Sequence, residues 1–211
     1  MLKYNQVESD FNHPLVRECR GLILNEDTLE PVCVPFFKFG NYGESYCPNI
    51  DWSSASCLQK VDGSLIKIVR LSKDLLISTN GTIDAFKAPI AEQLGCKYKS
   101  FGEIVQEQLD AKHVQPLDFA EGYTFMFELV SPWTRVVVPW KKNDLYFLGL
   151  RHNDSLEELL PYDCGFSEKF KTPKKIDLHT LDDCIAATKA MPWDEEGYVV
   201  CDGKFNRVKI K

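Results

Sequence analysis

Short strand-like segments dominate this chain, and they constrain its fold more than any other feature. They are five to eight residues long and rich in β-branched and aromatic side chains. In chain order they are GLILN (21–25), VCVPFFKF (32–39), SLIKIVRL (64–71), LLIST (75–79), YTFMFELV (123–130), RVVVPW (135–140), LYFLGLR (145–151), GYVVCD (197–202) and RVKIK (207–211). Polar or glycine-containing turns such as NEDTLEP (25–31) and TNGT (79–82) separate several of them.

Helical periodicity is clearest in three segments, 84–94, 100–110 and 180–191. Thr180, with Asp182 and Asp183 in the following turn, is typical of a helix start. Because strands occupy both halves of the chain and helices are inserted without regular alternation, the sequence predicts an α+β fold with mostly antiparallel sheets and flanking helices.

The composition narrows the function classes. The 211 residues are 44% hydrophobic, which suits one domain over 1–211 with a sizeable core. There is no long apolar run and no secretory signal, so we expect no membrane partner.

The eight cysteines form no C-x-x-C pair and the four histidines show no metal spacing, so we expect reduced thiols, a cytoplasmic protein and no zinc site. The net charge of −6 argues against a broad basic surface but allows a local basic groove. Glycine-rich dinucleotide and P-loop motifs are absent.

Several charged residues interrupt the apolar strands. Lys60 lies in LQKVDGSLIKI (58–68), Glu128 in YTFMFELV, and Glu196 directly before GYVV. Lys209 and Lys211 alternate with Val208 and Ile210, and alternate residues of a strand share a face. One interpretation is a solvated sheet face with charges paired across strands. The alternative is a shared polar groove, because burying a charge is costly unless it has a partner.

These positions match a known superfamily. KVDGSL (60–65) resembles the K-x-D-G motif of the covalent nucleotidyltransferases, which comprise RNA ligases, DNA ligases and RNA capping enzymes. The later motifs follow in the family's order: STNGT (78–82) resembles motif Ia, FMFELV (125–130) motif III, LYFLGLR (145–151) motif IIIa, EGYVV (196–200) motif IV and VKIK (208–211) motif V. The fold expected from this resemblance is the adenylyltransferase domain.

Other segments resemble the phage-type RNA ligases of the RNA ligase 1 group: ECRGLIL (18–24), PFFKFGNYGE (35–44) and FELVSPWTRVVVPW (127–140). DNA ligases and capping enzymes usually carry arginine shortly after K-x-D-G, whereas Ser64 and Leu65 stand here. Those enzymes continue into an OB-fold domain, and larger phage ligases into a helical one. We expect neither accessory domain within 1–211, which leaves a naturally minimal ligase or a chain cut at the end of the catalytic domain.

The resemblance implies an ATP-dependent RNA ligase. Lys60 would attack the α-phosphate of ATP to give lysyl-AMP. The AMP would pass to an RNA 5′-phosphate, and a 3′-hydroxyl would displace it. The implied partners are ATP, RNA with 5′-phosphate and 3′-hydroxyl ends, and an end-healing kinase or phosphatase; the implied cofactor is Mg²⁺ or Mn²⁺. Three alternatives remain open at this point: a DNA ligase, a capping-type guanylyltransferase, and a nucleotide- or RNA-binding module without catalysis.

The residue types suit this chemistry. A free lysine titrates near pH 10.4, so roughly one in 10³ is unprotonated at pH 7, and nearby cations depress its pKa. Lys209 and Lys211 would supply that field and contact the α-phosphate. Carboxylates suit magnesium, so Glu196 is a candidate metal ligand, Glu128 a ribose or metal ligand, and Asp62 a further metal ligand close to the nucleotide.

The remaining candidates each have a structural alternative. Arg20 and Lys38 match positions that bind nucleotide phosphate or ribose, or form exposed ion pairs. Three aromatic residues would stack on the base or pack in the core: Phe39, Phe127 and Tyr198. Gly63 would allow close backbone approach to the ligand, and Ser64 would donate to a phosphate or shape the turn. The basic segments EKFKTPKK (168–175) and KFNR (204–207) would contact RNA or remain solvated.

Overall fold

The computed structural model describes residues 1–211, apart from the side chain of Ser167. Strands form three sheets in which every pairing is antiparallel. The predicted α+β fold with mostly antiparallel sheets is therefore confirmed.

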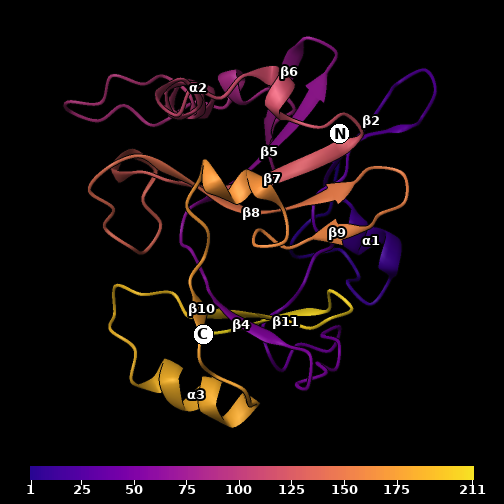
Figure 1. The fold of residues 1–211 in the computed structure, drawn as a ribbon, viewed down its shortest axis with the longest axis vertical. Helices are drawn as coiled ribbons and strands as arrows, with labels where there is room; N and C mark the ends of the chain where they lie inside the picture. The colour runs from indigo at the N-terminus through magenta and orange to yellow at the C-terminus, as the bar shows by residue number, and fades with distance from the viewer.

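The five-stranded sheet has the order β6-β5-β7-β8-β9. Its strands are β5 (Ser64–Leu71), β6 (Asp74–Thr79), β7 (Tyr123–Val130), β8 (Asp144–His152) and β9 (Glu158–Leu159). Helix α2 (Phe101–Ala111) covers its outer face (Figure 1). The main core lies between them, where Ile104 and Leu109 of α2 pack with Ile66 of β5 and Phe127 of β7. Burial of these apolar side chains is the main driving force for the folding of this half of the molecule.

The four-stranded sheet has the order β10-β4-β11-β12. Its strands are β4 (Ser56–Gln59), β10 (Lys175–Ile176), β11 (Tyr198–Cys201) and β12 (Arg207–Ile210). Helix α3 (Leu181–Lys189) covers its outer face and buries Cys184 against Cys57, Val200 and Val208 (Figure 1). The two large sheets thus form two layers, each with a helix outside, and the connection from β4 to β5 passes from one layer to the other.

A small sheet and several short helices complete the fold. The sheet has the order β1-β2-β3, with strands β1 (Leu2–Lys3), β2 (Arg20–Leu24) and β3 (Pro31–Cys33). Helix α1 spans Pro14–Glu18, and the short 3₁₀ helices are η1 (Ala85–Lys87), η2 (Pro116–Asp118), η3 (Pro132–Thr134) and η4 (Gly165–Glu168).

Two of the predicted helices form as expected. The segment at 100–110 is α2, and the segment at 180–191 is α3, where the Thr180 hydroxyl accepts a hydrogen bond from the Asp183 N–H. The prediction for 84–94 is wrong beyond one turn, since only η1 forms. Pro89 explains this difference, because proline has no N–H and disfavours helical backbone at the preceding residue.

Two strand predictions also need correction. Segment 135–140 is a loop rather than a strand, because the N–H groups of Val137 and Val138 donate to the Asp62 carboxylate and not to a neighbouring strand. Segment 32–39 is a ladder strand only through Cys33. Beyond it, the Val34 N–H donates to the Thr124 hydroxyl at 2.7 Å, so the chain runs across side chains of β7.

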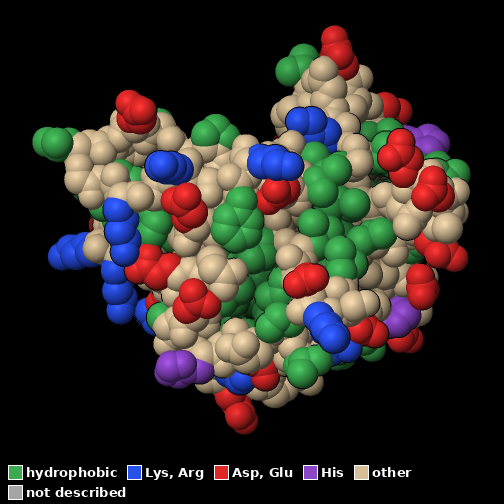
Figure 2. Space-filling view, turned by 90° about the horizontal axis from the view of Figure 1, so that it is seen from above, with side chains coloured by type: hydrophobic (Ala, Val, Ile, Leu, Met, Phe, Trp, Pro, Cys, Tyr) green, Lys and Arg blue, Asp and Glu red, His purple; other side chains and the backbone are tan. Residues whose placement is uncertain are grey.

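The surface carries both signs of charge. On the face drawn in Figure 2, hydrophobic side chains gather in the middle, and acidic and basic side chains are interspersed among them and around the margin. Among the described residues, no helix is both long and apolar enough to cross a membrane.

Candidate active site

The β4–β5 connection places Lys60 between the two large sheets. Lys60 directly follows β4, and its backbone N–H donates to the Gly197 carbonyl at 2.9 Å. Its amine forms an ion pair with Glu196, and only 20% of the Lys60 side chain is exposed. This pairing fixes the lysine against the turn that leads into β11.

A cavity of about 240 Å³ opens between the sheets beside Lys60. Both layers line it: β5, β7 and β8 from the five-stranded sheet, and β4, β11 and β12 from the four-stranded one. Its polar lining residues are Arg20, Gln59, Lys60, Glu128, Arg207, Lys209 and Lys211, and its apolar ones are Phe36, Phe39, Leu58, Val61, Leu65, Leu148, Leu160, Pro173 and Val199. The cavity therefore combines apolar walls with an excess of cations.

Strand alternation in β12 directs a row of cations into this cavity. Val208 and Ile210 are buried on the α3 side, whereas Lys209 and Lys211 line the cavity, as the alternating pattern predicted. Burial, reinforced by Arg20 and the neighbouring lysines, lowers the pKa of Lys209 to about 8. Lys211 Nζ lies 3.7 Å from Glu196 Oε1, so Glu196 contacts both Lys60 and Lys211.

Two further charged groups that line the cavity, Lys60 and Glu128, have shifted pKa values. Burial lowers the pKa of Lys60, an effect that the Glu128 carboxylate opposes and Lys211 reinforces. Burial also raises the pKa of Glu128 to about 7, although Lys60 and Arg20 partly offset this rise. A lysine whose pKa is lowered by burial and by a neighbouring cation is in the environment expected of an amine nucleophile.

Arg20 and Phe39 extend the cationic wall. Arg20 Nη1 is buried without a hydrogen-bond partner, and the guanidinium lies 5.3 Å from the centre of the Phe39 ring. Lys209 Nζ lies 5.2 Å from the same ring centre. No ion pair involves Arg20 in the described part of the chain, so the exposed-ion-pair alternative does not hold for it. A buried donor without a partner is suited to an anionic ligand.

These observations accompany clear similarity to known proteins. The family model described as "RNA ligase" matches residues 18–211. The chain belongs to the RNA ligase family.

Individual relatives give the extent of this likeness. The chain is 32% identical, over 96% of its length and 30% of the relative's, to the "Putative bifunctional polynucleotide kinase/RNA ligase" of Autographa californica nuclear polyhedrosis virus. It is 28% identical to RNA ligase 1 of bacteriophage TS2126, over 72% of this chain and 38% of the phage protein. The chain thus spans about a third of the length of these relatives.

Solved structures share the fold. An archaeal ATP-dependent RNA ligase superposes with a TM-score of 0.58 at 13% identity, covering 87% of this chain and 49% of the archaeal one. A Naegleria gruberi RNA ligase variant solved with ATP and Mn gives a TM-score of 0.52 at 15% identity, covering 74% and 48%. The adenylyltransferase fold predicted for this RNA ligase family member is therefore confirmed.

Asp62 and Gly63 of the K-x-D-G motif make contacts within the protein. Asp62 is 3% exposed, and its Oδ2 accepts hydrogen bonds from the N–H groups of Val137 and Val138, each at 2.7 Å. The Trp140 indole donates to the Asp62 carbonyl at 2.7 Å. The predicted metal role of Asp62 stays a prediction, but the geometry gives this carboxylate a positioning role for loop 135–140.

Gly63 lies close to the backbone of β7, and its predicted approach to the ligand stays a prediction. A Cβ atom at this position would lie 2.2 Å from the Leu129 carbonyl oxygen. The glycine therefore lets the chain enter β5 directly beside β7, and this contact fixes Lys60 relative to Glu128.

Four other candidates lie outside the cavity lining. Lys38 is 7% exposed, and its amine faces the rings of Tyr4 and Phe11 at 4.7 and 4.3 Å. Ser64 begins β5 opposite Leu129. Phe127 is fully buried in the main core, and Tyr198 lines a neighbouring cavity. The predicted nucleotide contacts of Lys38, Ser64 and Tyr198 are untested. Phe127 packs in the core, which is the alternative to stacking on the base.

That neighbouring cavity, of about 280 Å³, shares Gln59 and Lys60 with the first one, and Asp62 lines it as well. Glu196, Tyr198, Trp140 and Lys174 also line it. Of the predicted basic segments, Lys174 thus lines the same cavity as Lys60, whereas Lys169 and Lys171 form ion pairs with Asp118 and Asp144.

Sequence reasoning missed several lining residues, above all Gln59 and Arg207. Arg207 is 7% exposed and ion-paired, so within the KFNR segment only Lys204 adds to a solvated basic surface. The sequence could have indicated Arg207, because alternate residues of a strand share a face and Arg207 alternates with Lys209 and Lys211.

The carboxylates fit a divalent cation held jointly with a nucleotide. Glu196, whose carboxylate contacts Lys60 and Lys211, lines the cavity beside Lys60, and Glu128 lines the adjoining one. Among the described residues, no group of three or more His, Cys, Asp or Glu side chains could hold a metal ion. Magnesium commonly binds one or two carboxylates together with waters and substrate phosphates, which is what these residues offer.

Proposed function

We propose that this chain is the catalytic domain of an ATP-dependent RNA ligase that forms lysyl-AMP on Lys60. The observation that carries the proposal is the position of Lys60. Its amine lies at the edge of an apolar-walled cavity, against Glu196 and close to Lys211 and Glu128. Membership of the RNA ligase family gives this geometry its chemical interpretation.

In the first step, the neutral Lys60 amine attacks the α-phosphorus of ATP. An N–P bond forms, the P–O bond to the leaving pyrophosphate breaks, and the amine loses a proton to solvent. Burial around Lys60 raises the fraction of neutral amine by lowering its pKa. Lys209 and Lys211 neutralise charge on the α-phosphate, and Arg20 supplies a buried donor to a phosphate or ribose oxygen.

The base and the metal have separate places in this arrangement. The apolar side chains of Leu58, Leu148 and Val199 form walls suited to a planar base, and Phe39 adds an aromatic ring. Glu196, with Glu128, would hold Mg²⁺ or Mn²⁺. Such an ion neutralises phosphate charge when bound.

The later steps transfer AMP to an RNA 5′-phosphate and then seal that end to a 3′-hydroxyl, which releases AMP. The viral relative carries both a kinase and a ligase in its name. We therefore propose that a 5′-end-healing kinase prepares the substrate of this ligase.

Incubation with α-labelled ATP and Mg²⁺ tests the proposal directly. The wild-type chain should acquire a covalent AMP label that Lys60→Ala loses completely. Lys73→Ala is the matched control, because Lys73 is an exposed lysine in the turn between β5 and β6, and it should label like wild type.

Persistence of label in Lys60→Ala would overturn the nucleophile assignment. Labelling by GTP instead of ATP would indicate a capping-type guanylyltransferase. Transfer of AMP to 5′-phosphorylated nicked DNA but not to RNA would indicate a DNA ligase, and tight ATP binding with no covalent label would indicate a binding module.

A further inference from the structure

Arg207 is a buried cation on the nucleotide cavity that the proposed reaction leaves unused. It precedes Lys209 by two residues in β12 and lines the same cavity. The residue is 7% exposed, and its guanidinium lies 4.2 Å from the centre of the Phe36 ring. Its position is therefore set by packing as well as by charge.

One side of the guanidinium is engaged and the other is free. Arg207 Nη1 lies 2.6 Å from Glu158 Oε2 and donates to the Phe205 carbonyl at 3.4 Å. Arg207 Nη2 is buried and has no hydrogen-bond partner among the described residues. A buried, charged donor without an acceptor is costly in free energy, so this atom is prepared for an acceptor that arrives with a ligand.

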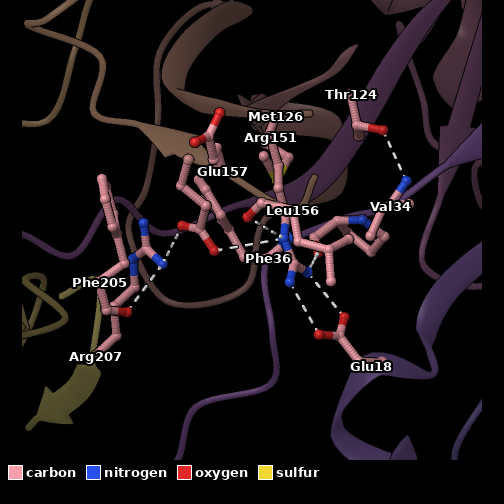
Figure 3. A network of polar contacts seen from close by, with 12 residues as sticks. Glu18, Val34, Phe36, Thr124, Met126, Arg151, Leu156, Glu157, Phe205 and Arg207 are labelled. Carbon is pink, nitrogen blue, oxygen red and sulfur yellow. Dashed lines mark hydrogen bonds and ion pairs between the residues drawn. The ribbon is translucent and has the colours of Figure 1, made fainter. Parts of the chain in front are cut away.

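A chain of buried charges holds Arg207 in place (Figure 3). Glu158, whose side chain is 8% exposed, also lies 3.7 Å from Nε of Arg151. Arg151 in turn binds both carboxylate oxygens of Glu18 at 2.8 and 2.9 Å and the Pro35 carbonyl at 2.9 Å. The network links α1, β8 and β9 to β12.

This network contributes little to stability by itself, because desolvation of buried ion pairs offsets much of their attraction. Its clearest effect is to fix the direction of Arg207. Four charged groups in one rigid arrangement leave Nη2 as the donor that is free to meet a ligand.

The strand geometry says which part of a nucleotide this donor meets. Lys211 contacts Glu196, the ion-pair partner of Lys60, and so marks the reacting end of the cavity. Arg207 lies four residues earlier, about 13 Å along an extended strand. Around it, Phe36 packs with Leu65 in an apolar cluster. Arg207 therefore faces the end of the cavity away from the reacting phosphate.

We infer that Arg207 binds the nucleoside part of the nucleotide, with Nη2 donating to a ring nitrogen of the base or a ribose oxygen, and that Glu158 is the positioning residue for it. This inference rests on the proposed nucleotide-binding function of the cavity. It assigns to Arg207 substrate binding without a part in the chemical step.

Single-turnover labelling of Lys60 over a range of ATP concentrations tests the assignment. Arg207→Met should raise the ATP concentration for half-maximal rate roughly ten- to hundredfold, the usual loss for a hydrogen bond from a charged group. The maximal rate should stay within about twofold, since the reacting phosphate is remote. Glu158→Gln should raise the half-maximal concentration by a smaller factor. Lys204→Met, which removes an exposed cation from the turn before β12, should change neither quantity.

ATP analogues that each lack one acceptor identify the atom and keep the test independent of folding. The set comprises the 2′-deoxy, 3′-deoxy, 1-deaza, 3-deaza and 7-deaza forms. The analogue without the acceptor should bind more weakly than ATP to wild type but equally to Arg207→Met, or to Arg207→Lys if the methionine variant does not fold.

Three results would overturn the inference: an unchanged half-maximal concentration, a loss confined to the maximal rate, or equal discrimination of every analogue by wild type and variant. Absence of label in wild type would instead contradict the proposed function itself.

Discussion

The Glu196 carboxylate bridges two lysines, pairing with the Lys60 amine through Oε2 and lying 3.7 Å from Lys211 through Oε1. The bridge joins the end of β4, the entry to β11 and the end of β12. A carboxylate in contact with an amine favours its protonated form, which is not nucleophilic. Glu196 must therefore shift its interaction toward another cation before Lys60 reacts, and this is consistent with a shared role in metal binding.

Glu196→Gln should accordingly slow labelling of Lys60 roughly hundredfold, the scale of one lost electrostatic contact in a transition state. It should also raise the Mg²⁺ concentration needed for half-maximal rate. Titration of Mg²⁺ at saturating ATP measures both effects. Glu195→Gln is the control, because this neighbouring carboxylate is exposed. Equal Mg²⁺ requirements in the two variants would remove Glu196 from the metal site.

The pKa of Lys209 leads us to expect that the labelling rate falls at alkaline pH. Burial and the surrounding cations lower its pKa to about 8, so the free enzyme loses this charge as the pH rises through about 8. Because the protonated form is the one that attracts the triphosphate, kcat/KM for labelling should fall above that pH. Lys209→Arg should remove the falling limb, since a guanidinium remains charged. The same limb in the arginine variant would show that another group causes it.

The period-two pattern of RVKIK allowed the most accurate prediction of the site, because alternation alone decides which β12 side chains enter the cavity. Burial of Val208 and Ile210 on the α3 side confirms this alternation. The same argument applied to Arg207 would have found it, but its partner Glu158 is about fifty positions away, and sequence spacing does not reveal a contact across two sheets.

The prediction of a strand at 135–140, in the loop before β8, was wrong for a different reason. RVVVPW has strand composition, yet its N–H groups bind the Asp62 carboxylate. Propensity describes how a segment fits a sheet, and it cannot anticipate an acceptor supplied by another motif. The surroundings of Lys38 were also not predictable from its local sequence, since aromatic side chains from the first fifty residues surround its amine. Its predicted nucleotide contact stays a prediction.

Asp62→Asn separates the positioning role of Asp62 from a metal-binding one. A neutral amide oxygen accepts weaker hydrogen bonds than a carboxylate, so hydrogen exchange at the Val137 and Val138 amides should accelerate roughly tenfold. The Mg²⁺ requirement for labelling should stay unchanged. Asp74→Asn, an exposed substitution at the start of β6, provides the comparison. A higher Mg²⁺ requirement with unchanged exchange would support the metal-ligand prediction instead.

Gly63→Ala should destabilise the fold by forcing β5 away from β7. The new Cβ would lie 2.2 Å from the Leu129 carbonyl oxygen and 3.2 Å from Glu128 Cγ. The clash with the carbonyl oxygen can be removed only if the backbone moves. We expect a loss of about 1–3 kcal/mol in the free energy of unfolding, as for other overpacked sites.

Urea unfolding measures this loss, with Gly81→Ala as the matched control. The nearest atom to a Cβ at Gly81 is Thr79 Oγ1 at 3.9 Å, and neither glycine has a positive φ, so backbone strain does not distinguish them. The control should remain within about 0.5 kcal/mol of wild type. Because the clash displaces the strand that follows Lys60, labelling should also fall in Gly63→Ala under conditions where the variant is folded. Equal unfolding midpoints for the two variants would mean that β5 and β7 can separate at this point without cost, and that Gly63 does not set the position of Lys60.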